Sequence, residues 1–263
     1  MATVADILAF LETLAPRSMK MDWDNVGLLC GSRKAEVTKI LVALDPFEGV
    51  CTEAAAIGAD LIVTHHPLIF QALKSITDDT SIGRSIQLLC REGISAINAH
   101  TNLDCAPGGV NDRLASALGL SEICVMDPMG TDTGGEEWGL LRKGTHQEQP
   151  LSDFLSLVKN ALGCPGLRYV DGGKPVHKVA VGGGACASEL MDAYHAGCDT
   201  FVTSDVKYNQ FWDAKDLGMN LIDAGHFYTE NPITACLAEK IAARFPELEV
   251  KISETHRDCM KFY

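Results

Sequence analysis

The chain has 263 residues, 46% of them hydrophobic, which is a globular composition with room for one large domain or two ordinary ones. Its formal net charge of −13 argues against nucleic-acid binding, which needs a basic surface, and leaves room for a neutral ligand or for an anion gathered by bound metal. No apolar run approaches the ~20 residues of a membrane span. The ten cysteines are scattered and form no C-x-x-C pair, so we expect buried, reduced thiols in a cytoplasmic protein.

The first half of the chain alternates helix-like and strand-like segments. The first fifteen residues predict a surface helix whose apolar side chains share one face, namely Val4, Ile7, Leu8, Leu11 and Leu14. A polar loop at 22–27 follows. Strands are then expected at 39–44, 61–64 and 95–99, and helices at about 48–57, 81–92 and 111–118. This β-α-β-α-β order predicts a parallel sheet with right-handed crossovers.

The second half repeats this pattern after a stretch rich in glycine. Glycine and proline crowd residues 127–147, which indicates a domain boundary. A second α/β unit follows, with helices expected at 151–161 and 187–196 and strands at 177–181 and 200–203. Asn231 and Pro232 suit the start of a last helix that runs to about Arg244. The sequence therefore predicts an α/β protein of two domains with mainly parallel or mixed sheets.

Side chains that can bind a metal follow three predicted strands. They are His65 and His66 after the first strand, His100 and Asp104 after the second, and His226 and Glu230 after an apolar run at 221–224. Open α/β sheets bind ligands at the carboxyl edge, because helices cover both faces. Imidazoles and carboxylates without cysteine suit one or two divalent ions such as zinc, iron, manganese or nickel.

Each of these pairs also has an ordinary explanation. Adjacent strand residues point to opposite faces, so His65 and His66 can share a site only if the strand has ended, as Pro67 suggests. His226 and Glu230 lie four residues apart, which puts them on one face in a helix but also fits a surface pair. Asp104 could bridge two ions. His100 and Asp45 could orient a ligand from behind, although His100 also fits a core histidine.

The turn at Gly182, Gly183 and Gly184 is a further candidate. Together with Ala187 it matches G-x-G-x-x-A between a strand and a helix, the shape of a phosphate-binding loop, although a tight turn explains it equally. Asp205, at the end of the next strand, could contact the ribose of a nucleotide or cap a helix. The remaining histidines have no such company and are expected to be structural: His146, His177, His195 and His256.

Five stretches, in this order, resemble one known family. They read W-D-N-V-G-L, T-H-H-P-L-I-F, N-A-H-T-N-L-D, G-G-V-N-D-R-L-A-S-A-L-G-L and D-A-G-H-F-Y-T-E. The chain is similar to the GTP cyclohydrolase 1 type 2 homologues, described as hexameric proteins with a dinuclear metal centre. The resemblance implies a homohexamer and two divalent metal ions per chain, with His65, His66, Asp104, His226 and Glu230 as ligands. It also implies that the C-terminal segment completes the first domain.

From this resemblance and the glycine-rich stretch we expect a metal-binding domain of residues 1–126 and 224–263 and a second domain of residues 127–223, with the metal site at the strand ends between them. The chain departs from the family at Asn209, where a histidine is expected, and at 136–139, where Gly-Arg-Ile-Gly is expected. These departures bear on substrate contacts. We expect Asn209 and Gly183 to line the same cavity as the metals.

Two functions fit these observations. The first is a dinuclear-metal-dependent hydrolase that acts through metal-bound water on a nucleotide, as a GTP cyclohydrolase does, or on a phosphoester. No Ser-His-Asp or Cys-His arrangement competes as a nucleophile, and no residue is assigned as catalytic. The alternative is a non-catalytic metal-binding ring or interaction protein. Open coordination positions on the ions favour the hydrolase, and closed shells favour the alternative.

Overall fold

The computed structural model describes residues 1–263, which divide into two compact units. The first unit contains Met1–Leu103 and Ile233–Arg257, and the second contains Asp104–Pro232 and Asp258–Tyr263. Both are α/β with mixed sheets, as the sequence predicts. The domain bounds expected from the sequence, 1–126 with 224–263 and 127–223, remain a prediction. None of the helices has both the length and the apolar composition to span a membrane.

The first unit is built on a five-stranded sheet with the strand order β15-β4-β5-β6-β2. Its central strands are parallel and agree with those predicted: β4 (Lys39–Ala43), β5 (Leu61–Thr64) and β6 (Ser95–Asn98). β15 (Glu249–Ile252) was not predicted and pairs in parallel with β4. β2 (Gly27–Cys30) pairs antiparallel with β6 and forms the other edge. The short strands β1 (Ala2–Thr3) and β3 (Glu36–Val37) pair separately.

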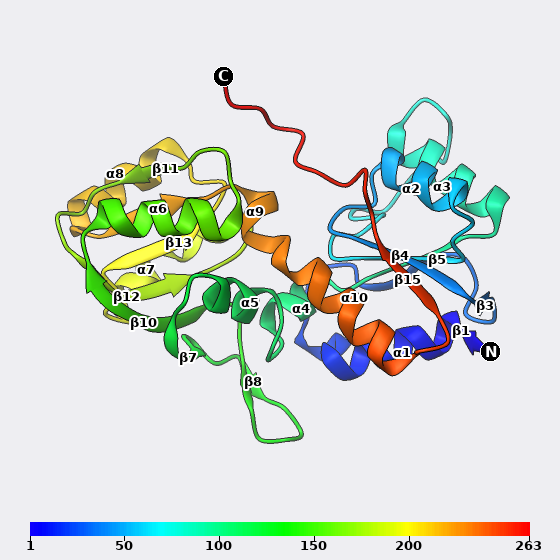
Figure 1. Ribbon diagram of the computed structural model, residues 1–263, viewed down its shortest axis with the longest axis horizontal. Coiled ribbons are helices and arrows are strands. Elements are labelled where there is room, and N and C mark those ends of the chain that lie inside the picture. Colours follow the sequence, from blue (N-terminus) through cyan, green and yellow to red (C-terminus); the bar gives the residue numbers. More distant parts are fainter. The chain divides into compact units, whose positions relative to one another are not determined.

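Helices cover both faces of this sheet (Figure 1). α2 (Glu48–Ala56) and α3 (Ser81–Glu92) pack on one face around buried Val50, Ala54 and Leu89. α1 (Val4–Leu14) and α10 (Pro232–Arg244) lie on the other face, and Phe10 meets Phe245 edge to face at 5.7 Å. α1 begins in a capping box formed by Thr3 and Asp6 and is followed by a 3-10 turn, η1 (Arg17–Met19). With both faces covered, the carboxyl edge of the parallel strands is left for ligands.

The second unit has a six-stranded sheet with the order β11-β14-β13-β12-β10-β7. Its centre is parallel: β12 (Val176–Val181), β13 (Thr200–Thr203) and β14 (Asn220–Asp223). The remaining strands are antiparallel and were not predicted: β7 (Ser121–Val125), β10 (Arg142–Gln149) and β11 (Arg168–Val170). The glycine-rich stretch forms a ribbon of β8 (Gly130–Thr131) and β9 (Glu137–Trp138) that lies within this unit.

Two helix pairs enclose the second sheet. α5 (Val110–Ala117) and α6 (Leu151–Leu162) pack around Leu114, Phe154 and Val158. α7 (Leu190–His195) and α8 (Tyr208–Leu217) pack around Leu190, Phe201 and Ala214. The helix predicted at 187–196 begins as a 3-10 turn, η2 (Cys186–Glu189), and α8 was not predicted. Two further short helices, α4 (Thr101–Cys105) and α9 (His226–Glu230), carry candidate ligands.

Candidate metal centre

Three imidazoles gather at the carboxyl edge of the first unit's sheet. His65 and His66 directly follow β5, and His100 follows β6 by two residues. One ring nitrogen of each lies within 4.8 Å of the others, which is a spacing that can hold a metal ion. His65 is fully buried, while His66 and His100 are half-buried. The strand does end before His65, so both adjacent histidines join one cluster.

Each of these rings is fixed through its Nδ1 atom. His65 Nδ1 donates to the backbone oxygen of Ala99 at 2.9 Å. His66 Nδ1 donates to Asp45 at 2.6 Å, and His100 Nδ1 donates to Asp24 at 2.8 Å. Metal-binding histidines typically use one ring nitrogen this way, because the hydrogen bond sets the tautomer and aims the other nitrogen at the ion. Nε2 is therefore the atom with which each ring would bind a metal.

The carboxylates behind the histidines are held in the charged form. Burial raises the pKa of Asp24, but hydrogen bonds from His100 and Thr101 outweigh burial and lower it to about 2. Burial likewise raises the pKa of Asp45, and hydrogen bonds from His256 and His66 bring it well below its ordinary value. The sequence identified Asp45 but missed Asp24 and treated His256 as structural. Asp24 lies in the W-D-N-V-G-L stretch, whose polar residues before a strand were the only available signal.

The second unit contributes an acidic cluster. Asp104 on α4 is 7% exposed and Glu230 at the end of α9 is 4% exposed, and an oxygen of one lies within 4.8 Å of an oxygen of the other. His226 Nε2 lies 3.1 Å from Glu230 Oε2, as their spacing on a helix predicts. Two carboxylates buried this close together repel each other unless positive charge lies beside them. Such a pair suits a divalent cation.

Asp205 orients His226. His226 Nδ1 donates to Asp205 Oδ2 at 2.7 Å, which repeats the arrangement of His66 with Asp45. Burial lowers the pKa of His226, but hydrogen bonds to Asp205 and Glu230 raise it to about 11. The same hydrogen bond lowers the pKa of Asp205. A metal that binds His226 must therefore displace a proton.

The glycine turn supports the acidic cluster from behind. Gly183 N donates to Asn111 Oδ1 at 2.7 Å, and Gly184 N donates to Thr229 Oγ1 at 3.0 Å. A Cβ atom on Gly184 would lie 2.1 Å from Glu230 Oε1, so only glycine leaves room for this carboxylate. Gly182 N donates to the backbone oxygen of Val202 at 3.0 Å, so all three amides of the turn are engaged within the unit. A phosphate contact at Gly182–Gly184 stays a prediction, as does the contact of Asp205 with a ribose.

A buried arginine, which the sequence did not single out, fixes the chain just beyond Asp104. Arg142 on β10 is 1% exposed and pairs with Asp112 at 2.9 Å. Its guanidinium also donates to the backbone oxygens of Cys105 and Ala106 at 3.2 and 3.1 Å. Because these residues directly follow Asp104, Arg142 holds the end of α4 against the second sheet.

Exposed aromatic rings surround His100 in the first unit. Trp23 is 64% exposed and Phe70 is 48% exposed, and their ring centroids lie 5.8 Å apart. Each also lies close to the His100 ring, at 6.3 Å for Trp23 and 6.1 Å for Phe70. All three pairs are edge to face, with interplanar angles of 73° to 78°. We call this group the aromatic corner. It exposes ring faces and edges beside the imidazole cluster.

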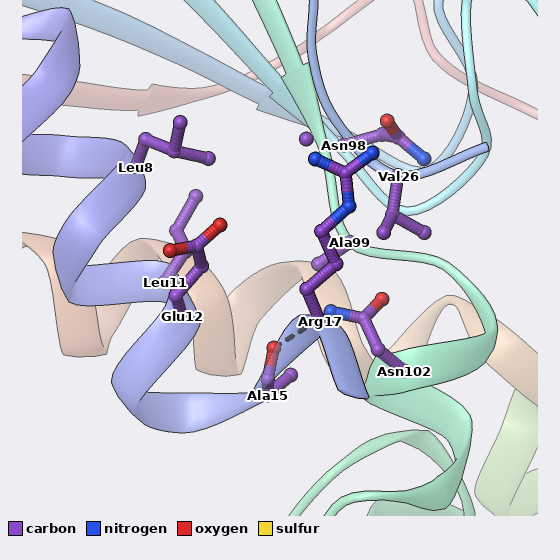
Figure 2. A pocket seen from close by; sticks show the side chains of 10 residues that line it. Leu8, Leu11, Glu12, Ala15, Arg17, Val26, Asn98, Ala99 and Asn102 are labelled. Carbon is purple, nitrogen blue, oxygen red and sulfur yellow. Dashed lines mark hydrogen bonds between the residues drawn. The ribbon is translucent and has the colours of Figure 1, made fainter. Parts of the chain in front are cut away.

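A cavity behind α4 is too small for a substrate. Figure 2 shows it between α1 and the segment that carries Asn98, Ala99 and Asn102. Its volume is about 10 Å³, which is the size of a single water molecule. Asn102 Nδ2 donates across it to the backbone oxygen of Ala15 at 2.7 Å, shown as a dashed line. This contact fastens the start of α4 to the end of α1.

Other predicted residues have different surroundings. Asn209 is exposed on α8, and its side chain donates to Asp213 at 3.5 Å, whereas Gly183 lies against Glu230. The two residues expected to share a cavity thus have different neighbours. His146, His177 and His195 belong to none of the groups of side chains close enough together to hold a metal ion. The expectation of buried cysteines is wrong for Cys90, Cys124 and Cys259, which are exposed.

The comparisons with known proteins agree with the resemblance seen in the sequence. Residues 2–259 match the family Duf34/NIF3 (NGG1p interacting factor 3). The chain belongs to this family. It is 37% identical to a GTP cyclohydrolase 1 type 2 homolog of Clostridium perfringens and 32% identical to one of Clostridium acetobutylicum, with 98% of each chain covered.

Solved structures agree over the same length. A Bacillus cereus protein related to NIF3 superposes with a TM-score of 0.93 at 26% identity, covering 100% of this chain and 99% of that one. A hypothetical protein of Staphylococcus aureus gives a TM-score of 0.90 at 29% identity, with 99% of each chain covered. The family and its two-domain α/β fold are therefore shown.

Proposed function

We propose that this protein is a metal-dependent hydrolase whose two divalent ions are bound by His65, His66, Asp104, His226 and Glu230. The observation that carries the proposal is the set of hydrogen bonds that fix each histidine through Nδ1, together with the buried carboxylates. Oxygen and nitrogen donors of this kind suit zinc, iron, manganese and nickel. Each cluster alone offers too few groups for two ions, which supports a site that uses both.

The path of the chain supports the same ligand set. The chain passes from the first unit to the second between Leu103 and Asp104, and returns between Pro232 and Ile233. Asp104 is the first residue after one passage, and Glu230 lies three residues before the other. α4 continues through the first passage and follows directly on His100. The carboxylates are thus covalently tied to the segments that join the units.

Divalent ions, when bound, supply Lewis-acid activation of water and of a substrate oxygen. The side chains contribute orientation and charge. The hydrogen bonds to Ala99, Asp45 and Asp205 hold the imidazoles in one tautomer, so that no ring must reorganise during turnover. Asp104 and Glu230 would offset part of the positive charge of the ions. The positive charge that remains would let the site accept an anionic substrate.

The aromatic corner favours a substrate that contains a planar ring. Faces of Trp and Phe stack on nucleobases, and each stacked base contributes about 1–3 kcal/mol of binding free energy. A bare phosphoester would leave Trp23 and Phe70 without a role, whereas a nucleotide would use both the rings and the metal. We therefore propose a nucleotide as the substrate, with GTP as the first candidate because of the relatives' name.

Hydrolysis by metal-loaded protein tests the proposed activity. Wild type loaded separately with zinc, iron, manganese or nickel should release product from GTP or from a phosphoester panel. His66→Ala and Glu230→Ala should lose at least about 99% of this activity, since each loses a metal-binding group. His195→Ala is the matched control, because His195 is exposed and outside the clusters. Equal rates in all four proteins would refute a metal-dependent hydrolase.

Binding of guanosine monophosphate and ribose 5-phosphate tests the ring separately. Trp23→Ala should weaken binding of the nucleotide about tenfold or more and leave ribose 5-phosphate unchanged, because only the nucleotide has a base to stack. Trp212→Ala, which removes another exposed tryptophan, should change neither. If Trp23→Ala weakens both ligands equally, the corner does not read the base.

The second unit exposes an apolar surface on α7 and α8 that favours self-association. This surface also supports the alternative function, a non-catalytic ring that binds other molecules. α7 and α8 expose Met191, Tyr194, Tyr208 and Trp212, and a hollow of about 430 Å³ lies along Leu190, Met191 and Leu217. Apolar surface of this kind commonly marks an interface. We propose that it takes part in a homohexamer.

Light scattering tests this assembly. It should show smaller particles for Met191→Glu but not for Met129→Glu, which changes a similarly exposed methionine outside α7 and α8. A monomeric wild type would overturn this assembly.

A further inference from the structure

Two cysteine side chains meet in the first unit, away from the histidine cluster. Cys30 is the last residue of edge strand β2, and Cys90 lies in the last turn of α3. Their sulfur atoms are 3.8 Å apart. Cys30 is half-buried and Cys90 is exposed. The other exposed cysteines are Cys124 and Cys259. Exposure and a neighbouring thiol therefore coincide at Cys90.

The local backbone allows the two sulfurs to come closer. A disulfide bond is about 2.05 Å long, so roughly 1.8 Å must be closed. β2 is an edge strand, and its register with β6 shifts between Leu28 and Cys30. The next residue, Gly31, has a φ of +100°, and α3 ends at Gly93 with a φ of +71°. Both cysteines thus lie beside an irregular or terminal stretch of backbone, Cys30 at the shifted end of an edge strand and Cys90 in the last turn of a helix.

We propose that Cys30 and Cys90 are an oxidative modification site, at which a peroxide converts the two thiols into a reversible disulfide that fastens β2 to α3. This proposal is independent of the proposed hydrolase. The closed loop contains about 60 residues, so the bond restrains the unfolded chain more than a short loop would.

The exposed thiol reacts first. The Cys90 sulfur attacks a peroxide oxygen, the O–O bond breaks, and Cys90 becomes a sulfenic acid while the hydroxide released takes up a proton to form water. The Cys30 sulfur then attacks the Cys90 sulfur and displaces hydroxide, which takes the Cys30 proton. Two thiols lose two electrons in total, and one hydrogen peroxide becomes two waters. Burial, with a smaller effect of Cys90, raises the pKa of Cys30 to about 12, which is consistent with Cys30 as the second partner.

Peptide mapping after peroxide treatment tests the proposal directly. Trypsin cuts after Lys20, Arg33, Arg84 and Arg91, so each cysteine lies alone in a tryptic peptide, residues 21–33 and 85–91. Full-length wild type treated with hydrogen peroxide should give these two peptides joined, about 2 Da lighter than their sum, and dithiothreitol should separate them. In Cys30→Ser, Cys90 should stop at the sulfenic acid, which dimedone traps.

Thermal unfolding provides a second readout. Oxidised wild type should unfold several degrees higher than the reduced protein, because the disulfide constrains the unfolded chain. Cys90→Ser should show no such difference, whereas Cys259→Ser should behave like wild type. Three results would overturn the proposal: a disulfide between Cys90 and a cysteine other than Cys30, overoxidation of Cys90 without a link to Cys30, or a Cys90 that reacts no faster than Cys124 and Cys259.

Discussion

The two units position their candidate metal-binding side chains in different ways. The first unit supplies imidazoles, each fixed through Nδ1 by a carboxylate or a backbone oxygen, so the charged groups lie behind the ligands. In the second unit the candidate ligands are themselves the acidic groups: Asp104 and Glu230 are buried beside each other, with His226 as the one histidine. The first cluster thus offers mainly imidazole nitrogens to a metal ion, whereas the second offers mainly carboxylate oxygens.

The supporting contacts differ in the same way. His65, His66 and His100 are each held at Nδ1 by a single hydrogen bond within the first unit. Around Asp104 and Glu230 the support comes from the fully buried Arg142, which donates to the backbone just after Asp104, and from the glycine turn that lies against Glu230. We infer that substitutions of the residues that support the candidate ligands lower stability and metal affinity more in the second unit than in the first.

The largest effect is expected at Arg142. Arg142→Met leaves Asp112 without its partner and several backbone oxygens without donors, so the free energy of unfolding should fall by about 3–5 kcal/mol. Arg84→Met breaks an exposed pair with Glu48 in the first unit and should cost less than about 1 kcal/mol. Urea unfolding measures both. Equal losses would erase the proposed difference between the units.

Gly184→Ala should displace Glu230 without a change in any ligand. The added Cβ would lie 2.1 Å from Glu230 Oε1, so we expect metal affinity to fall roughly a hundredfold, as when a group that orients a ligand is lost. Gly173→Ala is the matched control, because Gly173 also has a positive φ but no atom near the added Cβ. Both variants carry similar backbone strain. If calorimetry gives them the same metal affinity, strain rather than contact with Glu230 explains the loss.

Asp205→Asn should have a smaller effect on the metal. Asparagine still accepts a hydrogen bond from His226 and tolerates the positive φ of 53° at this position, but it lacks the negative charge. Metal affinity should fall about tenfold. Asp213→Asn is the control, because Asp213 is an exposed aspartate on α8, and it should leave metal affinity unchanged. Unchanged affinity in Asp205→Asn would show that Asp205 does not orient a ligand.

The smallest effect concerns the C-terminal segment of the first unit. Partial burial raises the pKa of Glu53, but hydrogen bonds from Ser253, Thr255 and the backbone of Glu254 outweigh it, so the folded pKa lies below 4.5. A lowered folded pKa contributes stability above the unfolded value, and this contribution disappears as the pH falls through the folded value. Wild type should therefore lose more stability than Glu53→Gln when the pH is lowered from 7 through this range. The free energy of unfolding is measured by denaturant titration at each pH. If it falls equally with pH in wild type and Glu53→Gln, the stabilising contact between Glu53 and the C-terminal segment is contradicted.

The sequence predicted the local structure well where periodicity was strong. β5 (Leu61–Thr64), α3 (Ser81–Glu92) and β13 (Thr200–Thr203) have the predicted bounds. Strands without a continuous apolar run were missed. β10 has only polar residues and one glycine, β11 has only three residues, and β15 reads Glu-Val-Lys-Ile with mostly exposed side chains. Each is stabilised mainly by pairing with a distant strand, which no local pattern reveals.

The candidate site shows the same limit. Imidazoles and carboxylates at strand ends could be found in the sequence because their chemistry is visible in single residues. Asp24, Arg142 and Asn111 could not, because their roles arise from contacts with residues 30 or more positions away. Gly184 was noticed for its turn, but the need for glycine comes from Glu230, which lies beside it only after folding.

Metal content measured by elemental analysis tests the central claim most directly. Wild type, His66→Ala, Glu230→Ala and the control His195→Ala should be purified without chelator and compared under identical metal supply. We predict about two ions per chain in wild type and His195→Ala, and a clear loss in both His66→Ala and Glu230→Ala with the fold retained by circular dichroism. Full wild-type metal content in both ligand variants would contradict the proposal that the two units share one metal centre.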